Sequence, residues 1–305
     1  MIVGILGGSG LYDLEGLTDV AEQVVATPFG APSGPVVTGK VGDGRGEIWL
    51  AFLARHGRGH RLMPSEINYR ANIHALKQLG AEKVISVSAV GSLREGLSPG
   101  DLVVVDQFID RTHRRESTFF GDGVVGHVGY GDPVCAVLAG AVHAAALEQG
   151  FQDGRAEERG RAGAPARARR AYRGGTYVCM EGPQFSTRAE SLLHRSWGAD
   201  VIGMTAATEA KLAREAELCF TSLALVTDYD CWHPEEEAVT ATSIVEVLLA
   251  NVSRAKDIVR HVLPGLPRLP ACGCARAAER AIMTAKDAIP AAARERLRVL
   301  YGRYL

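Results

Sequence analysis

The first ten residues, MIVGILGGSG (Met1 to Gly10), form a short apolar run that stops at a glycine-rich turn. A run of this length, rich in Ile and Val and closed by glycines, is typical of a buried strand that leads into a tight turn. Three later segments repeat the pattern of an apolar run followed by polar residues: EIWLAFLA (Glu47 to Ala54), KVISVSAV (Lys83 to Val90) and SLALVT (Ser222 to Thr227). We therefore expect four buried strands with polar side chains at their carboxyl ends.

Helical stretches lie between these strands, and most of them end near a glycine, as helix C-termini often do. They span residues 65–79, 134–149, 187–197 and 208–217. Alternating strands and helices predict an α/β fold with a central mixed, largely parallel twisted sheet flanked by helices. Ligands of such sheets bind beyond the carboxyl ends of the strands, which is where the polar side chains fall.

Composition and charge exclude several functional classes. The chain has 34 Lys and Arg against 35 Asp and Glu, so its net charge is −1 and no overall positive field would hold a nucleic-acid backbone. No segment approaches the run of about 18 apolar residues that spans a bilayer, and the N-terminus has neither a basic stretch nor a cleavage site. We expect a cytoplasmic protein that binds neither nucleic acid nor a membrane.

Two regions depart from the alternation of strands and helices. Residues 152–175 carry many arginines among Gly and Ala without an apolar stripe, which predicts a flexible surface insertion; a basic patch that binds anions is the alternative. Residues 263–270 (LPGLPRLP) form a Pro-rich connector to a helical tail. We expect one domain over residues 1–262, with the tail, residues 263–305, packed on it.

The cysteines are too sparse for a disulfide scaffold, and their spacing lacks the paired CxxC units of many structural zinc sites. They are Cys135, Cys179, Cys219, Cys231, Cys272 and Cys274. We therefore predict no metal site, with most of these thiols filling space in the core. The Cys272-Gly273-Cys274 pair is left as either a strained disulfide or two reduced thiols.

Three of the expected strand ends carry groups that suit an anion. The GGSG turn at residues 7–10 offers backbone N–H groups and a hydroxyl, but it is neither a Walker A loop nor a dinucleotide fingerprint. RHGRGH (Arg55 to His60) sets arginine forks beside imidazoles, and serines at 86, 88 and 92 surround the next strand end. Each element alone also fits a tight turn or a solvated basic loop, but the three together favour one phosphate site.

Asp228 and Asp230 follow the fourth strand and alternate along an extended backbone, so both carboxylates would face the same side. A single carboxylate there could simply cap a helix. A pair suits adenine, because an ionised carboxylate accepts from the N6 amino group and a protonated one donates to N7. Burial and like-charge repulsion would raise one pKa and leave an acid able to protonate a departing base.

Together these segments closely resemble the trimeric purine nucleoside phosphorylase family, and in particular its members that act on S-methyl-5'-thioadenosine. The resemblance runs from Gly4 to about Val262. It rests on GGSGLYD (Gly7 to Asp13), TPFGAPS (Thr27 to Ser33), LARHGRGH (Leu53 to His60), INYRANIHALKQLGAEKVIS (Ile67 to Ser86), GDLVVVDQFIDRT (Gly100 to Thr112), EGPQFSTRAE (Glu181 to Glu190), WGADVIGMT (Trp197 to Thr205) and TDYDCW (Thr227 to Trp232).

The resemblance implies a single-domain nucleoside phosphorylase fold and a pentosyl transfer in methionine and purine salvage. The reaction would be the reversible phosphorolysis of S-methyl-5'-thioadenosine to adenine and 5-methylthio-α-D-ribose 1-phosphate. It needs neither a metal nor an organic cofactor, since inorganic phosphate is the co-substrate. The family also implies a homotrimer, or a dimer of trimers, with active sites near the subunit interfaces.

The same resemblance assigns roles to residues. Phosphate would be held by Ser9, Arg55, His56, Ser88 and Thr205. Asp228 and Asp230 would be the catalytic pair that reads N6 and N7, with the assignment between them open. The base, the ribose and the 5' group would contact Ala89, Phe185, Met204, Ala241, Ile244 and Val245, together with His127 from a neighbouring subunit.

Two other functions stay open at this point. A phosphorylase of 6-oxopurine nucleosides or of methylthioinosine would need a donor where this chain has the Asp pair, and such a buried polar mismatch can discriminate by about 10⁴ to 10⁵. A nucleoside-binding protein without catalysis would bind the same ligands without turnover. The acidic pair disfavours the first alternative, and the intact set of Arg55, His56 and Asp228 disfavours the second.

Overall fold

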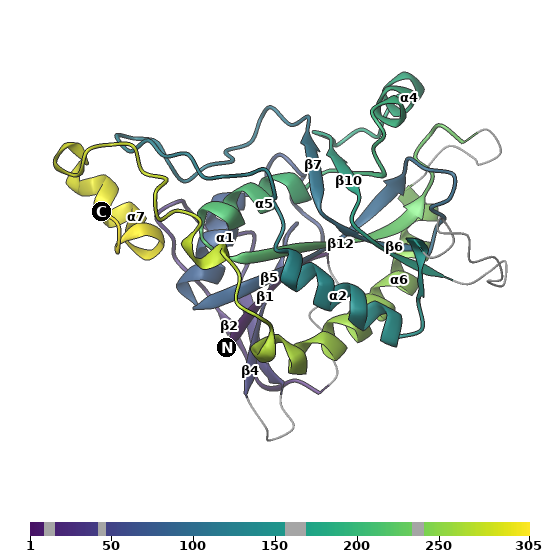
Figure 1. Cartoon of the computed structure of the whole chain (residues 1–305), viewed down its shortest axis with the longest axis horizontal. Coiled ribbons are helices and arrows are strands. Elements are labelled where there is room, and N and C mark those ends of the chain that lie inside the picture. The colour runs from purple at the N-terminus through teal and green to yellow at the C-terminus, as the bar shows by residue number, and fades with distance from the viewer. Residues whose placement is uncertain (9–15, 42–46, 156–168, 234–240) are drawn as a thin grey trace.

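The computed structural model describes residues 1–8, 16–41, 47–155, 169–233 and 241–305, with the side chains of 241–250 left aside. Within these ranges twelve strands form one mixed sheet, whose main path runs β2-β3-β4-β1-β5-β12-β6-β9-β8 (Figure 1). The strands are β1 (Ile2–Gly7), β2 (Thr18–Gln23), β3 (Val36–Val41), β4 (Ile48–Ala54), β5 (Ala81–Ser92), β6 (Leu102–Val105), β7 (Gln107–Asp110), β8 (Gln152–Asp153), β9 (Arg170–Arg173), β10 (Thr176–Cys179), β11 (Val201–Gly203) and β12 (Cys219–Asp228).

The four strands expected from the apolar runs are all present and adjacent. β4, β1, β5 and β12 lie side by side and are parallel to one another. Ser86 is in register with Leu6 of β1, and Ser88 with Ala224 of β12. Because the strands are parallel, their carboxyl ends meet at one edge of the sheet. The polar residues at the ends of β4, β5 and β12 are therefore brought together, as the sequence predicted. The prediction for Ser9, after β1, lies outside the described residues.

Helices cover both faces of this sheet. They are α1 (Tyr69–Gln78), α2 (Ala136–Glu148), α4 (Arg188–Ser196), α5 (Ala206–Glu215), α6 (Ala241–Val262) and α7 (Ala291–Tyr301), with short 3₁₀ turns at Leu263–Arg268, Cys274–Arg276 and Lys286–Ala288. Figure 1 shows α1 and α5 on one side of the β5–β12 pair and α2 with α6 on the other. The α/β class predicted from the sequence is thus confirmed. No helix in the described ranges combines the length and hydropathy of a bilayer-crossing segment.

The predicted helices match the structure except at some ends. The helix expected over residues 65–79 begins only at Tyr69, because the Asn68 side chain accepts a hydrogen bond from the Ala71 amide and caps the first turn. α4 begins where the EGPQFSTRAE motif predicts it. There Thr187 and Glu190 form a reciprocal capping box, which satisfies two amides of the first turn.

The arginine-rich segment over residues 152–175 differs from the expected surface insertion at both of its ends. Arg170–Arg173 forms β9 and pairs in parallel with β6. Ala171 and Tyr172 are buried in this strand, and the Tyr172 hydroxyl donates to the Gly96 carbonyl at 2.6 Å. A flexible loop is therefore the wrong interpretation for 170–173. The prediction for residues 156–168 lies outside the described residues.

The C-terminal tail packs against the body of the protein. Leu266, Leu297 and Tyr301 belong to the same apolar cluster as β1 and β5. The buried carboxylate of Glu217 accepts hydrogen bonds from the Ala278 amide at 3.0 Å and the Tyr304 hydroxyl at 2.7 Å, and it forms an ion pair with Arg303. A short antiparallel contact also joins residues 125–127 to 281–284, where the His127 amide donates to the Ala281 carbonyl.

Candidate active site

The candidate site lies at the carboxyl edge of the four parallel strands. At this edge β5 and β12 approach each other so closely that the position of Gly91 allows no side chain. A Cβ on Gly91 would lie 2.8 Å from a carboxylate oxygen of Asp228 and 3.2 Å from the Asp230 amide. Glycine is required here by this close approach, and it lets the Asp pair pack directly against the end of β5.

Asp228 and Asp230 differ in how their carboxylates are held. Oδ1 of Asp228 accepts from the Asp230 amide at 2.8 Å, and Oδ2 accepts from the Thr227 hydroxyl at 2.7 Å. Asp230 is 8% exposed with a backbone φ of 53°, and its buried Oδ2 has no hydrogen-bond partner among the described residues. A buried carboxylate oxygen without a partner is costly unless a ligand completes it. Asp230 is thus the carboxylate that is open to a ligand.

Burial raises the pKa of Asp228 above its ordinary value; the hydrogen bonds from Thr227 and the Asp230 amide oppose this shift, and the charge of Asp230 adds to it. The Thr227 hydroxyl can serve either protonation state. It has one hydrogen and two acceptors in reach, since it also lies 3.2 Å from the Val90 carbonyl. If it donates to Val90, its oxygen can accept a hydrogen bond from a protonated Asp228 carboxyl.

Arg55 is brought to the same edge, but its guanidinium points into the protein. It is 2% exposed and forms a two-point ion pair with the buried carboxylate of Glu209. It also donates to the carbonyls of Leu6 and Val87 and to the Ser86 hydroxyl. These bonds use all but one of its five N–H groups, so one Nη1 hydrogen is left for a ligand. Its predicted role as a phosphate ligand therefore stays a prediction.

His56 is half-buried beside Arg55. Its Nδ1 lies 2.8 Å from the Leu62 carbonyl, which assigns the Nδ1 hydrogen to that bond and leaves Nε2 as an acceptor in the neutral ring. Burial, and after it the charge of Arg55, lowers the pKa of His56 to about 4. The ring is therefore neutral at pH 7, and binding of an anion would favour its protonation.

Ser88 and Thr205 are the hydroxyl residues predicted for phosphate. The Ser88 hydroxyl is buried on β5 and has no hydrogen-bond partner in the described part of the chain. Thr205 precedes α5 and is 4% exposed, yet its side chain does not cap that helix. Its amide lies 3.4 Å from the Tyr177 hydroxyl. The Ser88 hydroxyl thus has hydrogen-bonding capacity that the described residues do not use.

The residues predicted for the base and ribose surround this edge. Ala89 is half-buried on β5, next to Ser88. The thioether of Met204 packs on Gly182, where a Cβ would lie 2.6 Å from its Sδ. Phe185 is 46% exposed, and the next residue accepts a hydrogen bond from the Cys231 thiol at 3.3 Å, which ties this loop to the Asp pair.

Four predicted residues cannot be placed in the site. Ser9 lies outside the described residues, and Ala241, Ile244 and Val245 are on α6 in the part whose side chains are left aside. His127 is exposed on a loop held by the C-terminal tail. An exposed position is compatible with its predicted contact to a neighbouring subunit.

Sequence reasoning missed three charged residues that build the site. Glu209 pairs with Arg55 from 154 positions away. Arg115 is almost fully buried; it donates to the carbonyls of Met204 and Glu181 and lies 5.4 Å from the ring centroid of Tyr69. Glu181 accepts from Ser65 and from the His113 amide, and these bonds outweigh burial and lower its pKa to about 2. Only the position of Glu181 within a family motif could have indicated its importance.

Comparisons with known proteins agree with this site. The family described as the Phosphorylase superfamily matches residues 2–264. The chain is similar to the S-methyl-5'-thioadenosine phosphorylase of Koribacter versatilis, at 55% identity over 99% of this chain and 96% of that protein. It is also similar to a crystal structure of a methylthioadenosine phosphorylase from an antarctic soil metagenomic library, with a TM-score of 0.87 and 44% identity over 98% of both chains.

A third relative carries a ligand. It is a mutant of the adenosine/methylthioadenosine phosphorylase of Schistosoma mansoni, crystallised in complex with methylthioadenosine, with a TM-score of 0.81 and 36% identity over 92% of this chain and 96% of that one. Identity of this extent shows that the chain belongs to the Phosphorylase superfamily and, within it, to the family of S-methyl-5'-thioadenosine phosphorylases. The resemblance inferred from the sequence motifs is confirmed.

Proposed function

We propose that the protein catalyses the reversible phosphorolysis of S-methyl-5'-thioadenosine to adenine and 5-methylthio-α-D-ribose 1-phosphate. The observation that carries the proposal is the Asp pair, in which one half-buried carboxylate has a raised pKa and the other, buried one has an oxygen without a partner among the described residues. This combination offers a proton donor and an acceptor side by side, as a 6-aminopurine requires. The names of the relatives support methylthioadenosine as the substrate.

On the base side, we assign the proton donation to N7 to Asp228. Burial shifts its pKa toward the protonated form, and the Thr227 oxygen can accept a hydrogen bond from the protonated carboxyl until the purine arrives. Asp230 then accepts a hydrogen bond from the N6 amino group through its open oxygen. Protonating the leaving base as the bond from C1' to N9 breaks contributes on the order of 10² to 10⁴ in rate.

On the phosphate side, an oxygen of inorganic phosphate attacks C1' from the face opposite the base. The Ser88 hydroxyl, the remaining Nη1 hydrogen of Arg55 and Nε2 of His56 are the groups available to hold the anion. Burial, and after it the charge of Arg55, lowers the pKa of His56, and the negative charge of a bound phosphate acts in the opposite direction and favours protonation of the ring. Ser9 and Thr205 are proposed to add hydroxyls. The reaction requires no cofactor, and its gain comes from placing the anion near an oxocarbenium-like centre.

We further propose that the protein acts as a homotrimer, or as a dimer of such trimers. The exposed loop of His127 would help to close the active site of the neighbouring subunit. The aliphatic residues Ala241, Ile244 and Val245 would line the pocket for the 5' group of the nucleoside. A thioether fits such a lining better than a hydroxyl, which would be left without a partner.

The test is a product assay with purified protein and phosphate, run separately with methylthioadenosine, adenosine, inosine and methylthioinosine. We expect phosphate-dependent release of adenine, fastest from methylthioadenosine. Release of hypoxanthine in preference to adenine would mean that the Asp pair has been misassigned. Ligand binding without release of any base would instead support a nucleoside-binding protein.

A further inference from the structure

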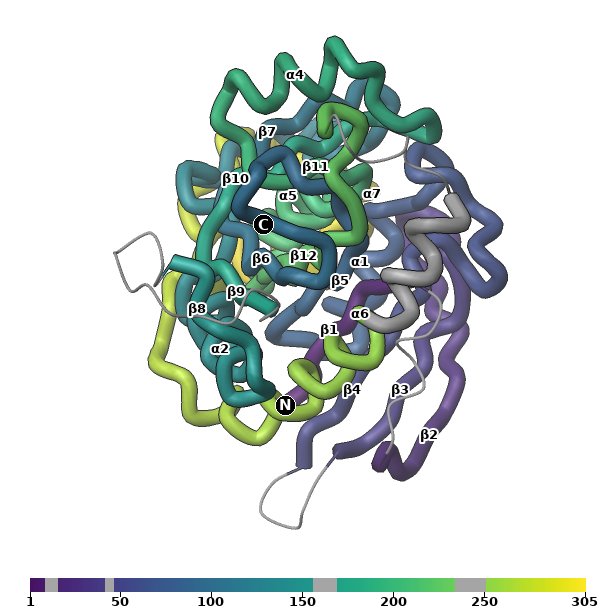
Figure 2. Tube along the Cα trace, turned by 90° about the vertical axis from the view of Figure 1, so that its right-hand side faces the viewer, coloured from purple at the N-terminus to yellow at the C-terminus, as the bar shows by residue number. Residues whose placement is uncertain are grey.

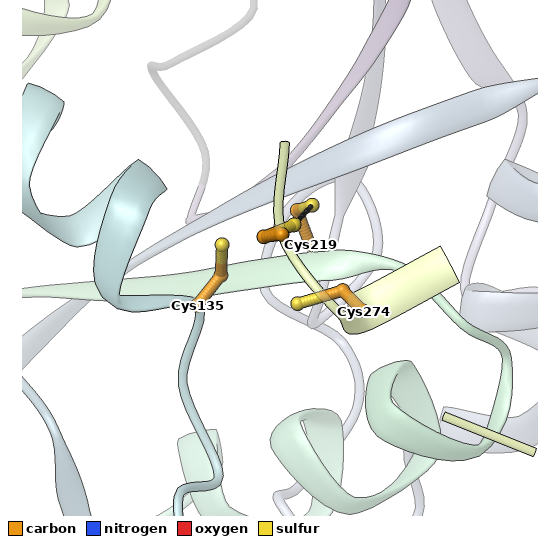
Figure 3. A group of neighbouring side chains, drawn as sticks. Cys135, Cys219 and Cys274 are labelled. Carbon is orange, nitrogen blue, oxygen red and sulfur yellow. Dashed lines mark hydrogen bonds between the residues drawn. The ribbon is translucent and has the colours of Figure 1, made fainter. Parts of the chain in front are cut away.

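Four cysteine side chains gather at one place from three segments that are far apart along the chain. Cys135 precedes α2, Cys219 begins β12, and Cys272 and Cys274 come from the C-terminal tail. Their sulfur atoms all lie within 4.8 Å of one another. Figure 3 shows the labelled side chains of Cys135, Cys219 and Cys274 arriving from three separate elements with their sulfurs turned toward one another. We refer to these four residues as the cysteine cluster.

The spacing of the sulfur atoms suits a tetrahedral metal ion. Zinc–thiolate bonds are about 2.3 Å long, so the sulfurs of a four-cysteine site lie about 3.8 Å apart. In the cysteine cluster the Cys219 and Cys272 sulfurs are 3.3 Å apart, and no pair is more than 4.8 Å apart. These limits enclose the required separation, and shifts of a few tenths of an ångström up to about 1 Å would bring each pair to it.

We propose that the cysteine cluster is a structural zinc site with Cys135, Cys219, Cys272 and Cys274 as its four ligands. Four thiols lose their protons to solvent as zinc binds, and the resulting site carries a net charge of −2. Arg214 can offset part of this charge, because its Nη1 lies 4.0 Å from the Cys274 sulfur. Soft thiolate ligands in tetrahedral array select zinc over calcium or magnesium.

Four protein ligands leave no open coordination position, so the ion would hold structure and take no part in the reaction. It would join the start of α2 and the start of β12 to the tail. The sequence rule that argued against zinc looks for pairs of cysteines close along the chain. Here only Cys272 and Cys274 form such a pair, with one residue between them, and the other two ligands arrive through the fold.

The first experiment measures metal in the wild-type protein, purified without a histidine tag, without chelators and under reducing conditions. We expect about one zinc per chain by elemental analysis, in line with a closed four-ligand site. Replacement by Co²⁺ should give the intense visible bands and the sulfur-to-metal charge-transfer band of a tetrahedral thiolate site. Protein that has no zinc and binds no Co²⁺ in this form would overturn the proposal.

The second experiment tests which cysteines bind the ion. The double variant Cys272→Ser/Cys274→Ser should lose the zinc and the Co²⁺ bands, and its thermal midpoint should no longer respond to a chelator. Cys231→Ser is the matched control, because this thiol lies outside the cluster and serine can keep its bond to the Ser186 carbonyl. The control should retain the zinc.

Two results would contradict the assignment directly. Zinc retained at full stoichiometry in the double variant would place the ion elsewhere. A mass lower by two hydrogens in the metal-free wild type, with two fewer titratable thiols, would show a disulfide in place of the zinc site. The measurements on the wild type need no variant, so they decide the question even if the double variant fails to fold.

Discussion

At the scale of single residues, Asp228 and Asp230 are chemically alike but held differently. Both oxygens of Asp228 already accept hydrogen bonds within the protein, whereas one oxygen of Asp230 is left open. The sequence predicted the pair but set both residues on an extended backbone, and this was wrong for Asp230: β12 ends at Asp228, and Asp230 lies in a turn with a φ of 53°. It could not predict this difference, because the difference depends on Thr227 and on the backbone turn at Asp230.

Replacing each acid by its amide should therefore have unequal effects. Asp228→Asn removes the proposed proton donor and sets an amide against donors, so we expect turnover of methylthioadenosine to fall by about 10² to 10⁴. Asp230→Asn puts an N–H where a 6-oxo group could accept it, so we expect the ratio of adenine release to hypoxanthine release to fall. Both are measured with the four-substrate assay.

Asp257→Asn, at an exposed ion pair with Arg260, is the control for this comparison. It should leave the ratio of the two products at the wild-type value. If both Asp228→Asn and Asp230→Asn also keep that ratio, the proposed reading of the base is wrong.

At the scale of elements, the strands that build the site were predictable because their apolar runs are continuous and end at polar residues. β9 was not predictable, since arginines flank its two buried residues and its only strong signal is Tyr172. Pairing with β6 decides its conformation, and pairing is not local information. The ion pair between Arg55 and Glu209 could not be predicted for the same reason, because Glu209 lies in a helix 154 positions away along the chain.

Helix α1 carries a histidine that should make stability depend on pH. His74 is 1% exposed, neither ring nitrogen has a partner among the described residues, and burial lowers its pKa to about 4. Between pH 6.5 and 4 the unfolded chain binds a proton that the folded chain does not, so folding is disfavoured as pH falls. The full effect is up to about 3 kcal/mol and is complete only below the folded pKa.

The substitution His74→Phe removes the group that binds this proton. It keeps an aromatic ring beside Phe29, whose ring centroid lies 5.4 Å from that of His74. We expect urea unfolding at several pH values to show that the free energy of unfolding of the variant rises relative to that of the wild type as the pH drops from 6.5 to 4. A constant difference in the free energy of unfolding across that range would mean that His74 is protonated equally in both states.

At the scale of the whole molecule, the contacts that hold the C-terminal tail contribute unequally to the free energy of unfolding. Glu217 is 4% exposed and has three donors, whereas the side chain of Arg303, one of these donors, is 56% exposed. We expect Glu217→Gln to cost about 1–3 kcal/mol of unfolding free energy: its carbonyl oxygen can keep the bonds from Ala278 and Tyr304 only by turning its NH2 group toward the Arg303 guanidinium, and the charge of the buried acceptor is lost. Arg303→Ala should cost less than about 1 kcal/mol.

Chemical unfolding of the two variants measures both values. Limited proteolysis in the connector at residues 263–270 should also increase for Glu217→Gln alone. Equal losses in the two variants would mean that the exposed ion pair, and not the buried carboxylate, holds the tail.

The short ladder between residues 125–127 and 281–284 links the tail to the loop of His127. The Met283 amide donates to the Val125 carbonyl at 2.9 Å, and the Val125 amide donates to the Thr284 hydroxyl at 2.8 Å. The two segments are therefore one mechanical unit, whose amides should exchange hydrogen together. An insertion in the Pro-rich connector would then also change the position or mobility of the His127 loop, although this loop is far along the chain from the inserted residues.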